Sequence, residues 1–380
     1  MKRRQLMRWG CACFSLAASS AIASEWKAPT RFGRPESSSE EGGLWAIMDD
    51  EERKLRRSPF RLREDALSNY LNGIVCKLGG EHCKDVRVYA VRAPYFNANM
   101  APNGMMQVWS GLLLRVENEA QLAAVLGHEL GHYLQRHSLA QLRDAKSRAA
   151  IGQVMGMFGA AGALGQLAML AGQFSYSRDQ EREADEIGIQ LMREAGYDPK
   201  EASKVWANLL EELRAIPEND PSKNSVLFAS HPPSEDRRKT LEALALGSQG
   251  DFGTRPFREK VSPHLTMMLE DELARGRLSE SIVLLTRLIG HEPSSPHYLH
   301  FRGEAYRLRN HEGDGAAALS DLTAAVQMPK VLPKTYRSLG YLHRAQGNLV
   351  PMAQAWDKYI ELMPNANDIA LIQQYLKEIK

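Results

Sequence analysis

The feature that most constrains this 380-residue chain is the pentapeptide at 128–132, which reads H-E-L-G-H. On an α-helix, positions i and i+4 share one face, so His128 and His132 can both reach one metal ion, with Glu129 beside a metal-bound water. About 0.02 accidental matches to H-E-x-x-H are expected in a chain of this length with 11 histidines. The apolar residues at 122–126 indicate that the helix is buried. We therefore predict a buried, metal-binding helix that starts at Glu119.

A catalytic zinc site usually has three protein ligands and leaves a fourth position for water, so a further ligand must come from elsewhere. In metzincins that ligand is a histidine six residues after the motif, but here that residue is Ser138, and we expect the off-register His137 to be structural. Glu181 and Asp185 are spaced i, i+4 on a predicted helix, so one can bind the metal while the other accepts the second N–H of a ligating histidine. Glu183 points roughly 160° away around that helix and is not expected to be a ligand.

The order of these motifs resembles the zinc endopeptidase family that contains HtpX, the mitochondrial Oma protease and the CAAX prenyl protease. H-E-L-G-H is followed about fifty residues later by E-x-x-x-D and then by S-H-P-P at 230–233. The resemblance covers 65–245 and implies an α+β, gluzincin-type domain that hydrolyses peptide bonds. It implies that Zn²⁺, one per chain, binds His128, His132 and Glu181, that Glu129 is the base, and that Asp185 supports a ligand from behind.

The segment after the predicted third ligand supplies two more candidates, His231 and Arg237. Peptide hydrolysis develops negative charge on the carbonyl oxygen, and a nearby cation or hydrogen-bond donor stabilises it. Either residue is a candidate for that catalytic role. For His231 two alternatives stay open: it closes the fourth metal position until substrate displaces it, or it is a structural histidine before a helix.

Residues 1–23 have the layout of a secretory signal peptide, with four basic residues, an uncharged stretch and a small-x-small site at 21–23. The alternatives are an amphipathic membrane anchor and lipid attachment at Cys11 or Cys13. Without this segment the formal net charge of +2 becomes −2, since four basic residues and no acid are removed. The two remaining cysteines, Cys76 and Cys83, are predicted to form a disulfide in the periplasm. There is no basic stripe with interleaved aromatics, so nucleic-acid binding is not expected.

The remaining boundaries follow from composition. We predict a flexible leader at 24–60, the protease domain at 61–246, a linker at 247–262 and a helical repeat domain at 263–380. Within the protease domain, a helix is predicted at 62–78 and paired strands at 86–91 and 105–109. The second strand is either an ordinary paired strand or an edge strand that pairs with an extended substrate.

The last 118 residues carry a repeat. Pro293, Pro329 and Pro364 are spaced by 36 and 35 residues, and Gly303 and Gly340 lie before the second and third of them. This period resembles the tetratricopeptide repeat (TPR), with about three units and a closing helix; the alternative is a generic helical bundle. An export signal followed by a protease domain and such repeats resembles the periplasmic branch of the family.

Residues 149–177 contain no charged side chain and are rich in Gly, Ala and Met. We predict a hairpin packed within the protein or making peripheral contact with a membrane surface; the alternatives are membrane insertion and a mobile loop. The chain as a whole is expected to trim misassembled envelope proteins, with the repeats docking it to the outer-membrane assembly machinery. The alternative is a chaperone or assembly adaptor in which the repeats dominate and proteolysis is secondary.

Overall fold

The computed structural model describes residues 26–147, 176–216, 231 and 234–378. The predicted signal peptide and nearly all of the uncharged stretch at 149–177 lie outside the described residues. Residues 26–30 have no regular secondary structure and belong to a unit separate from residues 31–380. All of the described helices and strands belong to the second unit, residues 31–380.

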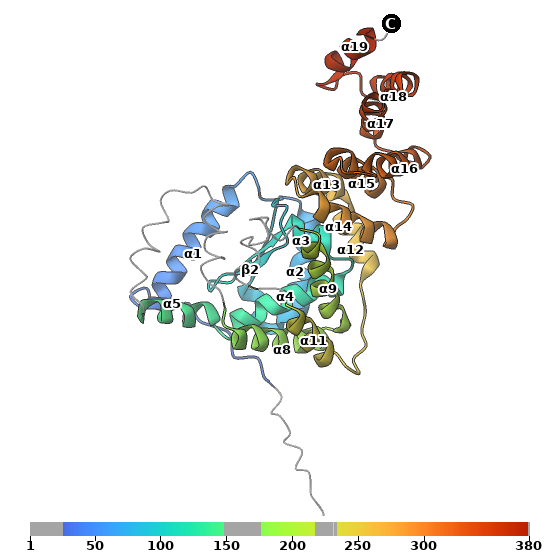
Figure 1. Cartoon of the computed structure of the whole chain (residues 1–380). Coiled ribbons are helices and arrows are strands. Elements are labelled where there is room, and N and C mark those ends of the chain that lie inside the picture. Colours follow the sequence, from blue (N-terminus) through green and yellow to red (C-terminus); the bar gives the residue numbers. More distant parts are fainter. Residues whose placement is uncertain (1–25, 148–175, 217–230, 232–233, 379–380) are drawn as a thin grey trace, which may run out of the picture. The chain divides into compact units, whose positions relative to one another are not determined.

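The N-terminal part of this unit is mostly helical with one small sheet (Figure 1). Its elements are α1 (Glu40–Arg57), α2 (Asp65–Gly79), a 3₁₀ helix (Gly80–Asp85), β1 (Arg87–Val91), β2 (Ala98–Met100), β3 (Met105–Trp109), α3 (Ser110–Arg115), α4 (Glu119–Leu134), α5 (His137–Ser147), α8 (Arg178–Glu194), α9 (Lys200–Arg214), α11 (Glu235–Leu244) and α12 (Thr254–Val261). Cys76 and Cys83, at the end of α2 and in the 3₁₀ helix, are joined by a disulfide. The predicted mainly helical class with a small sheet is confirmed.

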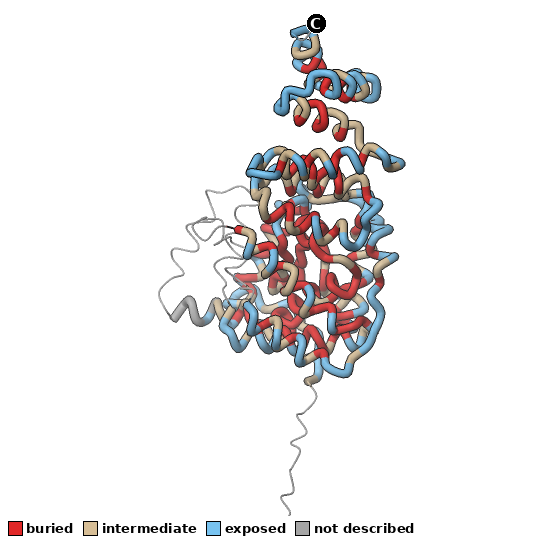
Figure 2. Tube along the Cα trace, turned by 45° about the vertical axis from the view of Figure 1, so that its right-hand side comes forward, coloured by how far each residue is buried: buried red, intermediate tan, exposed pale blue. Residues whose placement is uncertain are grey.

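Helix α4 begins as the sequence predicts. The Asn118 side chain accepts a hydrogen bond from the Gln121 backbone N–H, which satisfies one of the free donors of the first turn. Every residue of α4 except Ala124 is buried, and buried residues are concentrated where the helices of this part meet (Figure 2). The motif helix is therefore the centre of the N-terminal part.

Helix α8 packs directly against α4. Ser177 caps it in a capping box with Gln180. Where the two helices meet, a Cβ added at Gly131 would lie 2.9 Å from the Cα of Ala184. Glycine on α4 thus lets the two backbones approach, and this brings the side chains of both helices into one site.

The sheet has the strand order β1-β3-β2. β1 and β3 pair with each other, as predicted. The structure shows that these two strands run parallel, while β2 runs antiparallel to β3. The idea that 105–109 is an edge strand is wrong, because β3 is the central strand of the three. Strand β2 was not predicted, since its three residues are too few to show an alternating pattern.

The predicted flexible leader at 24–60 is corrected over about half of its length by α1. Ser39 caps this helix. Leu44, Met48 and Leu55 pack into a buried cluster with residues of β1 and β3. These three residues are spaced as on one helical face, but the charged residues between them hid the pattern.

The predicted linker at 247–262 is also corrected. It contains α12, whose Phe257 and Val261 are buried. The carbonyl of Phe252 accepts a hydrogen bond from the Ala120 backbone N–H at 3.1 Å. This segment therefore packs on the start of α4. Its glycines precede a short helix, and Pro256 lies in the first turn of that helix.

The C-terminal part consists of helices packed in succession. They are α13 (Leu265–Ala274), after a 3₁₀ turn (Ser262–His264), then α14 (Leu278–His291), α15 (Pro296–Arg309), α16 (Asp314–Val326), α17 (Pro333–Ala345), α18 (Leu349–Leu362) and α19 (Ile369–Glu378). α14 packs on α15, α15 on α16 and α17 on α18. A Cβ at Gly340 would collide with the Trp356 ring, so glycine admits the aromatic residue of the next helix. Within the described ranges, no helix has the length and hydrophobicity needed to span a bilayer.

Candidate metal centre

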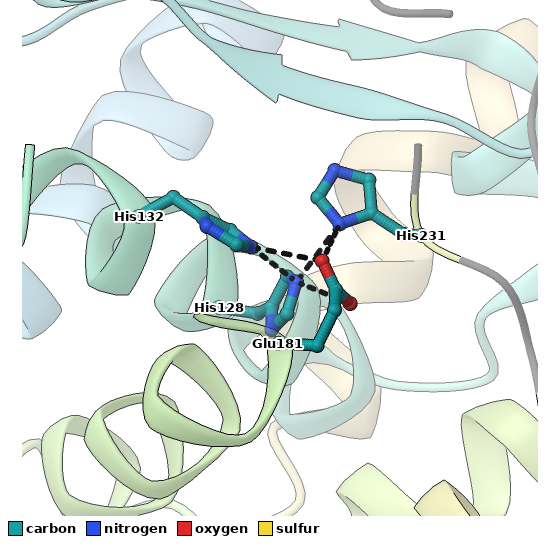
Figure 3. A group of neighbouring side chains, drawn as sticks. All are labelled: His128, His132, Glu181 and His231. Atoms are coloured by element: carbon teal, nitrogen blue, oxygen red, sulfur yellow. Dashed lines mark hydrogen bonds and ion pairs between the residues drawn. The ribbon is translucent and has the colours of Figure 1, made fainter. Parts of the chain in front are cut away.

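The motif residues meet between α4 and α8 (Figure 3). His128 and His132 project from successive turns of α4, Glu181 projects from the first turn of α8, and His231 precedes α11. One nitrogen or oxygen atom from each of the four lies within 4.8 Å of the others. The structure therefore brings together residues separated by up to 103 positions in the sequence.

The four residues, which we call the ligand group, face one another with their electron-pair donor atoms. The Nε2 atoms of His128 and His132 are 3.1 Å apart. The Nδ1 atom of His231 lies 2.8 Å from Oε1 of Glu181 and 3.2 Å from Nε2 of His128. Oε1 of Glu181 lies 3.3 Å from Nε2 of His132.

This arrangement fits a divalent metal ion. Tetrahedral ligands bound at the usual Zn–N and Zn–O lengths are separated from each other by roughly 3.3 Å, close to these distances. Three imidazoles and one carboxylate are ligands that zinc prefers. The surrounding buried charges are three carboxylates, Glu129, Glu181 and Asp185, and one guanidinium, Arg237. The excess of negative charge is what a divalent cation would balance.

Asp185 supports His128 from behind. Its Oδ1 lies 2.9 Å from Nδ1 of His128. Arg237 in turn donates two hydrogen bonds to the Asp185 carboxylate, at 2.7 and 2.8 Å. Its Nη1 lies 2.8 Å from Oε2 of Glu181, and its guanidinium stacks 3.9 Å from the centre of the Trp206 ring. Arg237 is therefore directed at two carboxylates of the site.

Glu129 is buried beside the ligand group, with Oε1 3.7 Å from Nε2 of His231. Burial raises the pKa of Glu129, since the charged form is poorly solvated there. Burial would also raise the pKa of Glu181, but His231 and His128 outweigh it and lower that pKa. Burial lowers the pKa of His132 well below its usual value, so this imidazole is neutral and able to bind a metal.

Two aromatic residues at the site were not predicted. The ring of Tyr176 stacks on His132 with centroids 3.8 Å apart, and Trp206 lies over Arg237. Tyr176 lies in the uncharged stretch at 149–177, and Trp206 lies in a segment whose sequence predicts only a helix. No local signal marks them as neighbours of the motif.

A pocket opens beside Glu129 and His231. Its wall is largely apolar and comes from α4, α8, α9, α11 and the start of β2 with the segment before it. The lining includes Ala98, Val125, Ile189, Val205 and Trp206. Because β2 pairs only with β3, its other edge is free of strand partners among the described residues. A polypeptide segment bound near Glu129 would thus meet a strand edge and an apolar pocket.

A buried helix with two metal-ligating histidines, a glutamate between them and an acidic ligand from a second helix defines a metallopeptidase site. Residues 61–245 match the model of Peptidase family M48, and this part of the chain belongs to that family. The resemblance inferred from the motifs is confirmed.

The relatives agree with this assignment. The chain is 27% identical over 256 residues to the "Beta-barrel assembly-enhancing protease" of Escherichia coli (strain K12), which covers 60% of this chain and 51% of that protein. It is 33% identical over 162 residues to "Mitochondrial metalloendopeptidase OMA1" of Schizosaccharomyces pombe. That match covers 41% of this chain and 45% of the relative. It is 30% identical over 182 residues to "Metalloprotease YcaL" of Escherichia coli (strain K12). That match covers 46% of this chain and 65% of the relative. The chain spans about half the length of the first of these relatives.

Proposed function

We propose that the chain is an exported, zinc-dependent metalloendopeptidase that cleaves misassembled proteins of the bacterial envelope. The observation that carries this proposal is the convergence of His128, His132, Glu181 and His231 beside the buried Glu129. Relatives named for β-barrel assembly support envelope proteins as substrates. Residues 1–23 act as the export signal and the mature chain works in the periplasm.

The residues of the chain have distinct roles in this proposal. His128, His132 and Glu181 hold one zinc ion, which supplies a Lewis acid and an activated water when it is bound. Glu129 takes the proton of the attacking water and delivers it to the leaving amine; its raised pKa suits both transfers. Asp185 fixes His128, and Arg237 acts mainly by positioning Glu181 and Asp185, to which it is paired.

The substrate is held as an extended strand. It pairs with the free edge of β2, in place of the 105–109 strand considered from sequence, and places one side chain in the apolar pocket. The pocket supports a preference for an apolar residue next to the cleaved bond. In this proposal the protease domain at 61–246 itself binds the part of the peptide next to the cleaved bond.

His231 is the fourth ligand of the resting site in this proposal, because its Nδ1 faces Glu181 and His128. The alternative role is stabilisation of the developing oxyanion. Replacement of His231 by Ala separates the two. A fourth ligand predicts that the variant keeps at least wild-type turnover, whereas an oxyanion donor predicts a fall in kcat of about 10²–10³-fold.

The C-terminal helices at 263–380 are tetratricopeptide repeats that dock the enzyme to the outer-membrane assembly machinery. The consecutive helix pairs and the contact of Gly340 with Trp356 support this reading. They also favour the second candidate function, an assembly adaptor in which proteolysis is secondary. Complementation of cells that lack the chain discriminates: full rescue by Glu129→Gln supports the adaptor.

The central test is proteolysis of an unfolded outer-membrane protein by the purified chain. Glu129→Gln removes the proton acceptor without changing the shape of the buried side chain. We expect cleavage to fall by about 10²–10⁴-fold while zinc content and unfolding midpoint are retained. Undiminished cleavage by this variant would contradict the catalytic assignment.

A further inference from the structure

The side of His132 that points away from the ligand group is held by two residues without a role so far, His137 and Glu183. Nδ1 of His132 lies 2.8 Å from Nδ1 of His137. On its other side, Nε2 of His137 lies 3.2 Å from Oε2 of Glu183. His137 is buried, whereas the side chain of Glu183 is 47% exposed. The three side chains form a chain of contacts from the ligand group to the surface.

The hydrogen-bonding roles in this chain of contacts are fixed by the orientation of His132. Its Nε2 faces the ligand group, so a metal bound there requires the lone pair on Nε2, and the proton sits on Nδ1. Nδ1 of His137 must then accept, which leaves the proton of His137 on Nε2. That proton is donated to Glu183, and every polar atom in the contact has a compatible role.

We propose that His137 and Glu183 are positioning residues that fix the tautomer and the ring orientation of His132. Metal-ligating histidines commonly donate their second N–H to a protein acceptor, and loss of that acceptor weakens metal binding. Helix α8 supplies the final acceptor for both ligating histidines of α4. Asp185 contacts His128 directly, and Glu183 reaches His132 through His137.

The backbone explains how His137 reaches this place. In an uninterrupted helix, position i+5 lies about 140° around the axis from position i, too far for His137 to contact the His132 ring. However, α4 ends at Leu134 and α5 begins at His137, and Arg136 between them has φ +55°. A non-glycine residue in the left-handed region is uncommon and is often found at functional sites. Here it turns the chain so that His137 faces back toward His132.

His137 is not itself part of the ligand group among the described residues. That group contains His128, His132, Glu181 and His231, and the near nitrogen of His137 meets the outer nitrogen of His132. The proposal rests on the metal site of the proposed function but not on proteolysis. Its test therefore measures metal binding as well as cleavage.

The experiment compares substitutions that keep or remove each acceptor. His137→Asn retains an oxygen near the position of Nδ1, whereas His137→Ala removes the acceptor. Glu183→Gln retains an oxygen for the His137 N–H, and Glu183→Ala does not. Glu186→Ala is the matched control, because Glu186 is an exposed glutamate of the same helix.

Zinc affinity of the full chain is measured by competition with a chromophoric chelator. We expect His137→Ala to lower the affinity by about 10–100-fold, and His137→Asn to recover most of the loss. Glu183→Ala should have a smaller effect, since its carboxylate is half exposed, and Glu186→Ala none. Imidazole ¹⁵N spectra of the zinc-loaded wild type should show His132 protonated at Nδ1.

Equal losses in the Ala and Asn variants of His137, or wild-type affinity in both, would overturn the proposal. If His137→Ala does not fold, the pair Glu183→Ala and Glu183→Gln still decides, because equal affinities in that pair would also overturn it. A wild type that binds zinc with this pattern but cleaves nothing would refute the proposed function and leave the positioning role intact. If the wild type is active and the His137 and Glu183 variants all bind zinc with equal affinity, only the positioning role would be refuted.

Discussion

Helix α9 contacts two buried clusters of charge that differ in their balance. Near its end, Glu212 joins an interface network between the N-terminal part and the C-terminal helices. The network comprises Arg115, Arg275, Arg287, Glu212, Glu272 and Glu280. In the middle of the helix, Trp206 covers Arg237 at the metal centre. The network has equal numbers of each charge, whereas the metal centre has an excess of carboxylates.

Two fully buried glutamates show what this difference does. Burial would raise the pKa of Glu272, but Arg115 and Arg275 outweigh it and hold that pKa at about 2. Burial raises the pKa of Glu129, and no arginine pairs with this carboxylate closely enough to reverse it. Buried charge by itself therefore does not mark a functional site. The informative property is charge that the protein leaves uncompensated.

The largest effect is expected when the balanced network is broken. Arg115→Met leaves three glutamates with one arginine fewer at the centre of the network, where Arg115 is 2.7 Å from Glu212 and 3.0 Å from Glu272. We expect the free energy of unfolding to fall by about 3–5 kcal/mol. Urea denaturation measures it, with the exposed Arg255→Met as control. A loss no larger than that of the control would remove the contrast between the clusters.

Removal of the metal should affect the metal centre and leave the balanced network unchanged. A chelator takes away the cation that balances the metal centre, and a ligand at 100 times its Kd contributes about 2.7 kcal/mol to the folded state. Stripping should therefore lower the unfolding midpoint of the wild type and of Arg115→Met, but not that of Glu181→Ala. Thermal denaturation with and without chelator checks this. An equal shift in all three proteins would mean that the chelator acts elsewhere.

The matched pair Glu272→Gln and Glu129→Gln should give the smallest effects and the sharpest contrast. Glu272→Gln deprives two buried arginines of a charged acceptor and is expected to cost about 1–3 kcal/mol. Glu129→Gln removes a poorly solvated carboxylate, so the metal-free protein should be at least as stable as the wild type. Chemical denaturation of both variants in chelator is the measurement. Destabilisation by Glu129→Gln comparable to that of Glu272→Gln would contradict the comparison.

The sequence predicted those parts of the site that have local signals. The i, i+4 pairs His128 and His132, and Glu181 and Asp185, lie on helices that start at recognisable caps. The contact of His137 with His132 was not predicted, because the left-handed Arg136 changes the helical register between these two histidines. This contact depends on one dihedral angle that the residue type does not disclose.

The errors in the fold have a common physical cause. Helices α1 and α12 each bury a few apolar residues that are set among charged or turn-forming residues. Composition alone assigns such segments to a leader and a linker. Their burial depends on partners far along the chain, such as Ala120, whose N–H binds the Phe252 carbonyl. Local periodicity identifies a helix, but it does not show what covers that helix.

The most direct test of the account is the zinc content of the purified full chain and its variants. We predict close to one zinc per chain for the wild type and for Glu129→Gln, and zinc loss for His128→Ala, His132→Ala and Glu181→Ala, measured by elemental mass spectrometry on folded protein. This result would tie the uncompensated charge between α4 and α8 to a metal ion. A wild type that stays zinc-free when zinc is supplied, or full zinc occupancy in all three alanine variants, would contradict it.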